Sequence, residues 1–364
     1  MAFVTSFYNW VWQESVWVPP GYTWDDFTPG KSSWNVPNSG DLWTYPFLLA
    51  GFFIFLNYCV FTPFIFIPFW KRFAPRDSAD ANEDMDELFL KHDGKPSKED
   101  IATLAKSIDW DQRRLERFLR RNSKYWKNFG KFLECSWGLL YYSSFCILGM
   151  VVLYDKPWAY DVRKCWTGFP KHDLEPELWW YYMIALAQYY SQITMDTFRP
   201  VRRKDFVQMQ IHHVVTICLV SFSFITNMMR MGALILAVHE CADIPLLTGK
   251  IAGYFGHQKV MNNCFIAFVV MWFVTRLGYF PSVLMRSTLF EAHVQEGLFY
   301  PVYYILNSLL IAIFLMHLIW TYIIVKSAFM RVQSGKVTDA RSSGSEESGD
   351  ENKNELLEEE KKKM

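Results

Sequence analysis

The chain has 364 residues, of which 51% are hydrophobic and 18% aromatic, and its 37 basic side chains balance 37 acidic ones. Its mean hydropathy of +0.01 averages long apolar blocks with strongly charged segments. This contrast excludes an ordinary soluble chain and predicts a polytopic membrane protein.

Seven apolar windows of about 20 residues are each long enough to cross a hydrocarbon core about 30 Å thick. They cover residues 44–70, 136–154, 177–195, 207–227, 231–254, 262–285 and 300–325. We therefore expect an all-α, polytopic helical membrane protein with about seven transmembrane helices.

The distribution of basic residues predicts the orientation of the chain. Lys31 is the only basic residue before the first window, whereas residues 71–135 contain fifteen. Because cytosolic loops are enriched in Lys and Arg, we expect a lumenal N-terminal segment over residues 1–41, a first transmembrane helix over 42–70 and a cytosolic C-terminus. The start of the chain has no basic stretch and is interrupted by Glu14, so it does not resemble a cleaved signal peptide.

The expected cytosolic loop, residues 71–131, contains a helical stretch with an apolar face. Part of it, "RRLERFLRRN" at residues 113–122, lies where the recognition helix would lie in a sequence that resembles the second half of a homeodomain. No basic arm precedes this segment, and it holds only about two helices. We expect no nucleic-acid partner and favour a basic segment close to anionic lipid headgroups.

The last segment, residues 333–364, is rich in charge and poor in apolar residues, so we expect it to be a disordered acidic cytosolic tail. It ends in "KKKM", with lysines at the third and fourth positions from the C-terminus. This ending resembles a dilysine retrieval signal and favours the endoplasmic reticulum membrane.

Two of the windows carry ionisable residues, which are costly inside a membrane and are functional by default. These residues are His212, His213, His239, Glu240 and Asp243. His239 and Asp243 are four residues apart and would share a helix face. His212 and His213, in "QIHHVVT", differ by about 100° around their helix, so only one of them can face a given target.

This cluster has two alternative interpretations that do not involve acid–base catalysis. It could serve only as hydrogen-bonding glue between two helices, or it could hold a metal. Histidine-box iron enzymes need many histidines, and His92, His172, His257 and His293 fall outside the windows or near their ends. We expect no metal, although His and carboxylate ligands leave a single ion open.

A histidine beside a carboxylate supplies a general base whose tautomer and basicity are set by its neighbour. Acyl transfer from a thioester needs such a base, a stabilised oxyanion and the exclusion of water. The chain contains no G-x-S-x-G nucleophile elbow. The histidine would act as the base, or as the nucleophile itself.

Residues 202–250, "RRKDFVQMQIHHVVT…HECADIPLLTGK", resemble the longevity-assurance motif of ceramide synthases. Residues 132–332 resemble the wider TLC domain, with a TLC-type bundle of six transmembrane helices, and "VWVPPGYTWDDF" at 16–27 resembles the lumenal segment of the animal enzymes. Two positions differ from the family pattern. Glu240 stands where an aspartate is usual, and Gly21 stands where an asparagine often accepts a glycan.

The resemblance implies N-acylation of a sphingoid base by a fatty acyl-CoA, giving ceramide or dihydroceramide. It implies catalytic roles for His212, His213 and Asp243, with His239 in the same motif. We expect further substrate-binding residues at Arg202, Arg203, Asn227, Arg230 and Glu240, the first two attracting the phosphates of CoA.

No cofactor is expected beyond the acyl-CoA substrate. Membrane lipids and a homo- or heterodimer are expected partners. The alternative is a non-catalytic TLC-like membrane protein that senses or shelters lipids, which would not need the His and Asp residues together.

Overall fold

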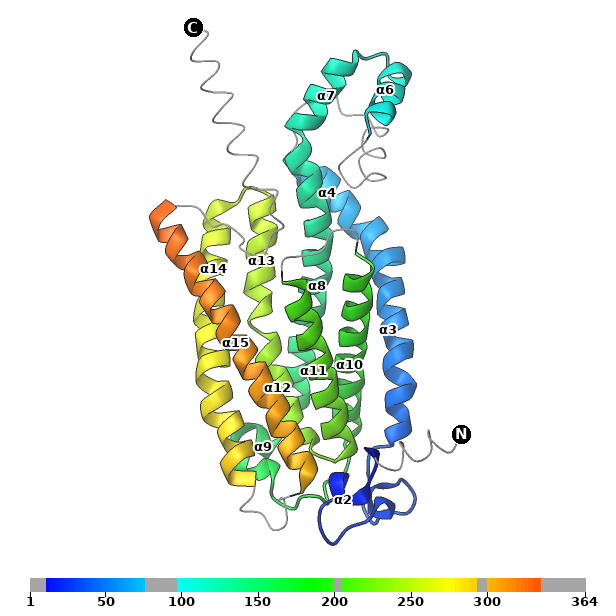
Figure 1. Ribbon diagram of the computed structural model, residues 1–364, viewed down its shortest axis with the longest axis vertical. Coiled ribbons are helices and arrows are strands. Elements are labelled where there is room, and N and C mark those ends of the chain that lie inside the picture. The colour runs from blue at the N-terminus through cyan, green and yellow to red at the C-terminus, as the bar shows by residue number, and fades with distance from the viewer. Residues whose placement is uncertain (1–10, 76–96, 200–204, 293–299, 335–364) are drawn as a thin grey trace. The chain divides into compact units, whose positions relative to one another are not determined.

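The computed structural model describes residues 11–75, 97–199, 205–292 and 300–334. All regular elements in these residues are helical, and no strand occurs among them (Figure 1). The expected all-α fold is confirmed. Beyond residue 334 the expected tail lies outside the described residues.

The helices run in the following order up to residue 153: α2 (Glu14–Trp17), η1 (Trp24–Phe27), η2 (Ser39–Trp43), α3 (Tyr45–Phe55), η3 (Leu56–Phe66), α4 (Ile67–Phe73), α6 (Lys98–Ser107), α7 (Gln112–Arg121) and α8 (Ser123–Leu153). They continue with α9 (Pro157–Tyr160), η4 (Val162–Cys165), α10 (Pro176–Thr197), α11 (Phe206–Ile225), α12 (Met229–Glu240), α13 (Asp243–Tyr254), α14 (Gln258–Trp272), η5 (Phe273–Met285), η6 (Ser287–Glu291) and α15 (Pro301–Ser334).

Six helical runs among the described residues are long and apolar enough to cross a membrane: Ser39–Phe73, Tyr125–Leu153, Phe206–Ile225, Met229–Tyr254, Gln258–Glu291 and Pro301–Met330. Each coincides with one of the expected windows. The polytopic helical membrane fold is confirmed by these six runs.

The seventh expected window, residues 177–195, forms α10 but does not belong to the six. Its helix is rich in tyrosine and glutamine, which lower its mean hydropathy. Many of its side chains are buried within the protein, and the buried ones include Gln188, Ser191 and Asp196. A helix covered by protein needs less apolar surface than one facing lipid, and this explains its lower hydropathy.

Prolines alter two of the long runs. Pro63 lies inside η3, and Pro281 lies inside η5, and both segments are π-helical. Proline has no N–H to donate and its ring clashes with the carbonyl four residues earlier, so the wider turn relieves a local conflict. The helix expected at 42–70 therefore begins in the 3-10 helix η2 and continues as α3, the π-helical η3 and α4.

The chain divides into two compact units, which we describe separately. The first unit comprises residues 1–51, 152–236 and 276–364, and the second comprises residues 52–151 and 237–275. In the first unit α11 packs against both α10 and α15. In the second unit α13 and α14 form a closely packed pair.

A buried tyrosine fixes α10 against the segment that joins α11 to α12. The hydroxyl of Tyr182 donates to the carbonyl of Met229 at 2.9 Å and lies 3.1 Å from the hydroxyl of Ser223. Gly232 faces this hydroxyl, and a Cβ atom placed there would lie 2.0 Å from it. Only glycine fits at this position, because the Tyr182 ring is fully buried and its hydroxyl is held from two sides.

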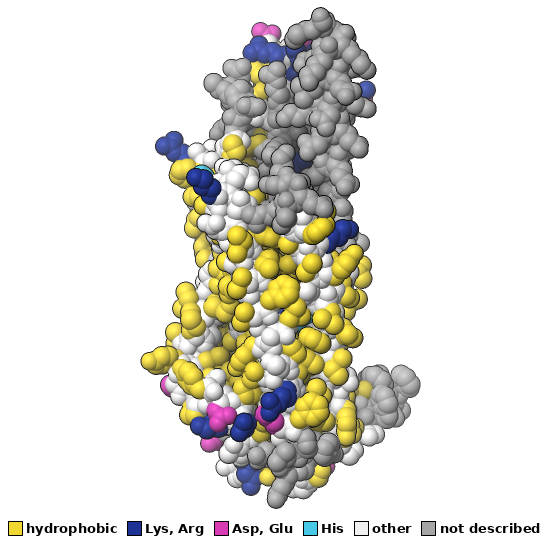
Figure 2. Space-filling view, turned by 90° about the vertical axis from the view of Figure 1, so that its left-hand side faces the viewer, with side chains coloured by type: hydrophobic (Ala, Val, Ile, Leu, Met, Phe, Trp, Pro, Cys, Tyr) yellow, Lys and Arg dark blue, Asp and Glu magenta, His cyan; other side chains and the backbone are white. Residues whose placement is uncertain are grey.

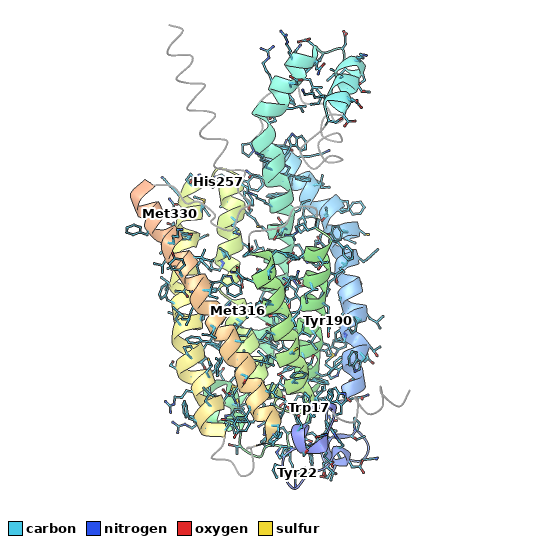
Figure 3. All side chains as sticks on the ribbon, viewed as in Figure 1. Trp17, Tyr22, Tyr190, His257, Met316 and Met330 are labelled. Atoms are coloured by element: carbon cyan, nitrogen blue, oxygen red, sulfur yellow. The ribbon has the colours of Figure 1, made fainter. Side chains whose placement is uncertain are left out.

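The N-terminal segment is tied to the loop that precedes α10. The backbone of Asn35 exchanges bonds with this loop, accepting from the Leu174 N–H at 2.8 Å and donating to the Asp173 carboxylate at 2.8 Å. Trp17 packs edge-on against Phe222 of α11 at 4.9 Å. The segment around Trp17 and Tyr22 is seen with its side chains in Figure 3. It thus forms part of the first unit rather than a free extension.

In the second unit, glycines let α13 and α14 approach closely. A Cβ atom at Gly249 would lie 3.1 Å from that of Cys264, and one at Gly253 would lie 2.9 Å from the sulfur of Met261. Glycines four residues apart present one small face, as is common where membrane helices pack tightly.

The helical stretch of the expected cytosolic loop is present as α6 and α7, which pack on each other in the second unit. Ser97 caps α6 through a reciprocal bond with Asp100. Leu104, Leu115 and Phe118 are buried, as the apolar face predicted. Their likeness to a homeodomain stays a prediction.

Many large apolar side chains are exposed on the helices, including Phe52, Tyr58 and Phe64 in the first run and Ile311, Leu318 and Tyr322 on α15. Figure 2 shows hydrophobic side chains across much of one face, with few charged groups among them. Apolar surface of this extent marks a surface that faces lipid or another protein.

Candidate active site

Helix α11 carries the pair of adjacent histidines. His213 is buried, at 2% exposure, whereas His212 is partly exposed. The hydroxyl of Thr216 donates to the carbonyl of His212 at 2.8 Å. The two imidazoles thus have different environments, as their spacing on the helix predicted.

Aromatic side chains from two other helices surround these imidazoles. Tyr189 of α10 lies 6.5 Å from the ring of His212 and 5.7 Å from that of His213. Trp320 of α15 meets His212 edge-on at 5.3 Å. Figure 3 labels Tyr190 and Met316, which mark the same regions of α10 and α15. These rings cover part of the His212 imidazole, and its Nδ1 atom is buried.

The Nδ1 atom of His212 is buried and has no hydrogen-bond partner among the described residues. Buried polar groups are nearly always satisfied, and an exception needs an explanation. An imidazole nitrogen kept dry and unengaged can accept a proton or attack a carbonyl carbon once a substrate arrives.

Two buried ionisable residues of the first unit were not identified from the sequence. His317 of α15 and Arg276 of η5 are 1% and 4% exposed, and both belong to the first unit. The His317 ring packs against Phe280 at 5.4 Å and Trp320 at 6.4 Å. Both residues lie inside expected membrane windows, so the rule that identified His212 could also have identified them.

The acidic part of the candidate site lies in the second unit. Glu240 ends α12 and is 3% exposed, Asp243 begins α13, and His239 and Asp243 are partly exposed. Cys241 and Ala242 separate α12 from α13 within the helical run Met229–Tyr254, and the expectation that His239 and Asp243 share one helix face stays a prediction.

Pro245 explains this break. The proline ring clashes with the carbonyl four residues earlier, which is that of Cys241. The break therefore falls directly before Asp243, and it places the Asp243 carboxylate in the first turn of a new helix, where backbone N–H groups favour negative charge.

The structure thus groups the candidate residues by unit. It brings His212 and His213 together with Tyr189 and Trp320 in the first unit, and it places His239, Glu240 and Asp243 on adjoining turns in the second. Arg202 and Arg203 lie outside the described residues. Their expected role with CoA stays a prediction.

Asn227 and Arg230 contact a loop of their own unit. Asn227 has a positive φ of 57°, and its amide Nδ2 donates to the carbonyls of Pro170 and His172, both at 2.8 Å. Arg230 donates to the carbonyl of Lys164 at 3.4 Å. These bonds hold the loop before α10, and substrate contact by either residue stays a prediction.

Within the residues that the structure describes, no three His, Cys, Asp or Glu side chains come together in a group that could hold a metal ion.

Comparisons with known proteins all indicate the same family. A family model described as the TLC domain matches residues 131–326. The human protein ceramide synthase 5 is 33% identical over 350 residues, covering 94% of this chain and 88% of that protein. Mouse ceramide synthase 3 is 34% identical over 343 residues, covering 93% and 88%. Ceramide synthase hyl-1 of Caenorhabditis elegans is 38% identical over 226 residues, covering 58% and 60%.

Proposed function

The chain belongs to the ceramide synthase family of TLC-domain membrane proteins, and we infer that it is an acyl-CoA-dependent sphingoid-base N-acyltransferase. Its substrates are a fatty acyl-CoA and a sphingoid base, both of which carry long apolar chains. Its product is ceramide or dihydroceramide, and free CoA is released.

The observation that carries this proposal is the dry, unengaged imidazole nitrogen of His212 in the family's signature motif. In the direct route His212 takes the proton from the sphingoid amine while the amine nitrogen attacks the thioester carbon. The carbonyl electrons move to oxygen, then return as the C–S bond breaks. The CoA thiolate receives the proton, so amide and CoA thiol result.

A second route is equally compatible with a free imidazole nitrogen. The nitrogen attacks the thioester carbon and releases the CoA thiolate, and the sphingoid amine then displaces the imidazole from the acyl group while the proton lost by the amine passes to the thiolate. The signature motif alone supports the proposal that Asp243, His213, His239 and Glu240 also take part in the reaction.

The position of His212 suits an acyl donor with a large polar headgroup. His212 lies six residues after Phe206, where α11 begins, so it is about 9 Å along the helix at 1.5 Å per residue. In the proposed orientation this end of α11 is cytosolic. The thioester can therefore reach His212 while the CoA headgroup stays in water close to Arg202 and Arg203.

The remaining assignments rest on sequence patterns. We propose that the protein resides in the endoplasmic reticulum membrane with a lumenal N-terminus and a cytosolic C-terminus. It needs no cofactor besides the acyl-CoA substrate, binds no nucleic acid and associates as a homo- or heterodimer.

The proposal is tested by incubating the purified full chain in lipid nanodiscs with a panel of acyl-CoAs and sphingoid bases. Amide products are identified by mass spectrometry, and free CoA is measured in parallel. We expect one CoA per amide. Binding of the lipids without amide or CoA would instead indicate the non-catalytic, lipid-sheltering alternative.

A further inference from the structure

The proposed reaction also needs a group that stabilises an oxyanion, and the histidines and Asp243 do not supply it. Both routes pass through a tetrahedral carbon whose oxygen carries a negative charge. Stabilising this oxyanion with fixed donors is usually a major contribution to catalysis of acyl transfer. A donor for this purpose must lie close to His212, where the carbonyl carbon reacts.

Arg276 is a buried permanent cation in a membrane-spanning run. It is 4% exposed on η5, and an arginine does not lose its proton under ordinary conditions. Such a charge is expensive within a membrane and is kept for a function. Its guanidinium offers five N–H donors in a planar arrangement suited to an anionic oxygen.

The contacts between η5, η6 and α15 place Arg276 at the level of Trp320. Phe280 packs on His317 at 5.4 Å, and the Tyr303 hydroxyl donates to the carbonyl of Leu289 at 2.9 Å. Residue numbers rise on one segment as they fall on the other, so the two segments run antiparallel.

One turn back from Phe280 is Arg276, and one turn on from His317 is Trp320. Because the segments are antiparallel, these two steps point in the same direction. Trp320 meets the His212 ring at 5.3 Å, so Arg276 lies on the side of the unit where His212 lies.

We propose that Arg276 is a catalytic residue that binds the thioester carbonyl oxygen and stabilises the oxyanion formed during acyl transfer at His212. This inference rests on the proposed function. Because Arg276 is 4% exposed, its guanidinium is screened little by water, and its attraction for the anion is strong. The guanidinium keeps its own proton throughout and only donates hydrogen bonds.

The test compares Arg276→Lys, Arg276→Gln and Arg276→Ala in the purified full chain, with kcat and KM measured for acyl-CoA and sphinganine. Lys keeps the charge, whereas Gln keeps only hydrogen bonding. We expect Ala and Gln to lower kcat by about 10²- to 10³-fold, with little change in either KM. Lys should keep at least about tenfold more activity than Gln, because charge-assisted bonds are the stronger ones.

Arg286→Ala is the matched control, because Arg286 lies in the same membrane-spanning run but is exposed and paired with Glu291 at 3.0 Å. It should keep the wild-type kcat. Added ethylguanidinium should raise the kcat of Arg276→Ala and not that of Arg286→Ala. Gel filtration and thermal unfolding identify any variant that does not fold.

Two results would overturn the assignment. One is a folded Arg276→Gln variant with near-wild-type kcat, and the other is an equal loss in Lys and Gln variants, which would indicate a packing role. If Arg276→Ala fails to fold, comparing the kcat of Arg276→Lys with that of Arg276→Gln still tests the role of the charge. If wild-type protein forms no amide at all, the proposed function itself has failed, whereas amide formation by Arg276→Gln removes only this inference.

Discussion

The indole of Trp320 meets the imidazole of His212 edge-on, with ring centroids 5.3 Å apart and ring planes at 81°. Trp320 is 6% exposed, so its ring is held firmly against α11 by its surroundings. This contact fixes one side of the reactive ring and excludes water from it.

We therefore expect Trp320→Ala to lower kcat/KM by about 10²-fold, since small displacements of a reacting group can cost that much. Trp320→Phe retains an aromatic ring and should lose less than about tenfold. Steady-state kinetics on purified variants of equal thermal stability provides the measurement. Equal activity in Trp320→Ala and wild type would show that the ring does not position His212.

Asn227 holds the loop before α10 through two hydrogen bonds from one amide nitrogen. Asn227→Ala removes both bonds, takes a donor from the buried carbonyls of Pro170 and His172, of which the Pro170 carbonyl keeps the His172 N–H, and puts alanine at a positive φ. Each of these effects costs about 1–3 kcal/mol, so we expect the thermal midpoint to fall clearly. The thermal midpoint of Asn227→Gly should fall less, because glycine tolerates the positive φ.

Thr226→Ala is the neighbouring control. The Thr226 hydroxyl only donates to the carbonyl of Phe222, four residues earlier in the same helix. Its loss should cost about 1 kcal/mol. If the Asn227 and Thr226 variants unfold at the same temperature, the bridge from Asn227 to the loop contributes no stability.

His172 provides a test that depends on pH. Burial, opposed in part by the bond from Nε2–H to the Thr167 carbonyl and reinforced by the Arg230 charge, lowers the pKa of His172 from 6.5 to about 4. The unfolded chain binds this proton more readily, so protonation favours unfolding. The contribution to stability is complete above pH 6.5 and is lost as the pH falls from 6.5 to 4.

One pKa unit corresponds to about 1.4 kcal/mol, so this loss amounts to roughly 3 kcal/mol. Thermal unfolding between pH 7.5 and pH 4 measures it, and His172→Gln removes the titrating group. The wild type should lose more stability than the variant over this window. Parallel curves for the two proteins would mean that His172 is not buried in its neutral form.

The sequence predicted the helices well because apolar length is a local property. The seven windows all coincide with helices. Pro245 is visible in the sequence, and the clash of its ring with the carbonyl of Cys241 accounts for the break before Asp243. The lower hydropathy of α10 could be seen in its tyrosines and glutamines, but its burial depends on neighbours that periodicity does not identify.

The surroundings of His212 could not be predicted, because they come from distant parts of the chain. Tyr189 lies on α10, the helix before α11, and Trp320 lies on α15, near the end of the described residues, and neither belongs to the signature motif. Arg276 and His317 were available as ionisable residues within apolar windows, but only the fold reveals that they accompany His212. The motif identified Asn227 without indicating that its amide holds a loop.

The dependence of amide formation on His212 and Asp243 is the most direct test of the proposed chemistry. Wild type, His212→Ala and Asp243→Asn are purified in nanodiscs, and the amide formed from acyl-CoA and sphinganine is quantified by mass spectrometry. Loss of a positioned base costs about 10²- to 10⁴-fold in rate, so both variants should fall by that factor while retaining wild-type elution and thermal midpoint. Near-wild-type amide formation in both variants would contradict the assignment of the reaction to these residues.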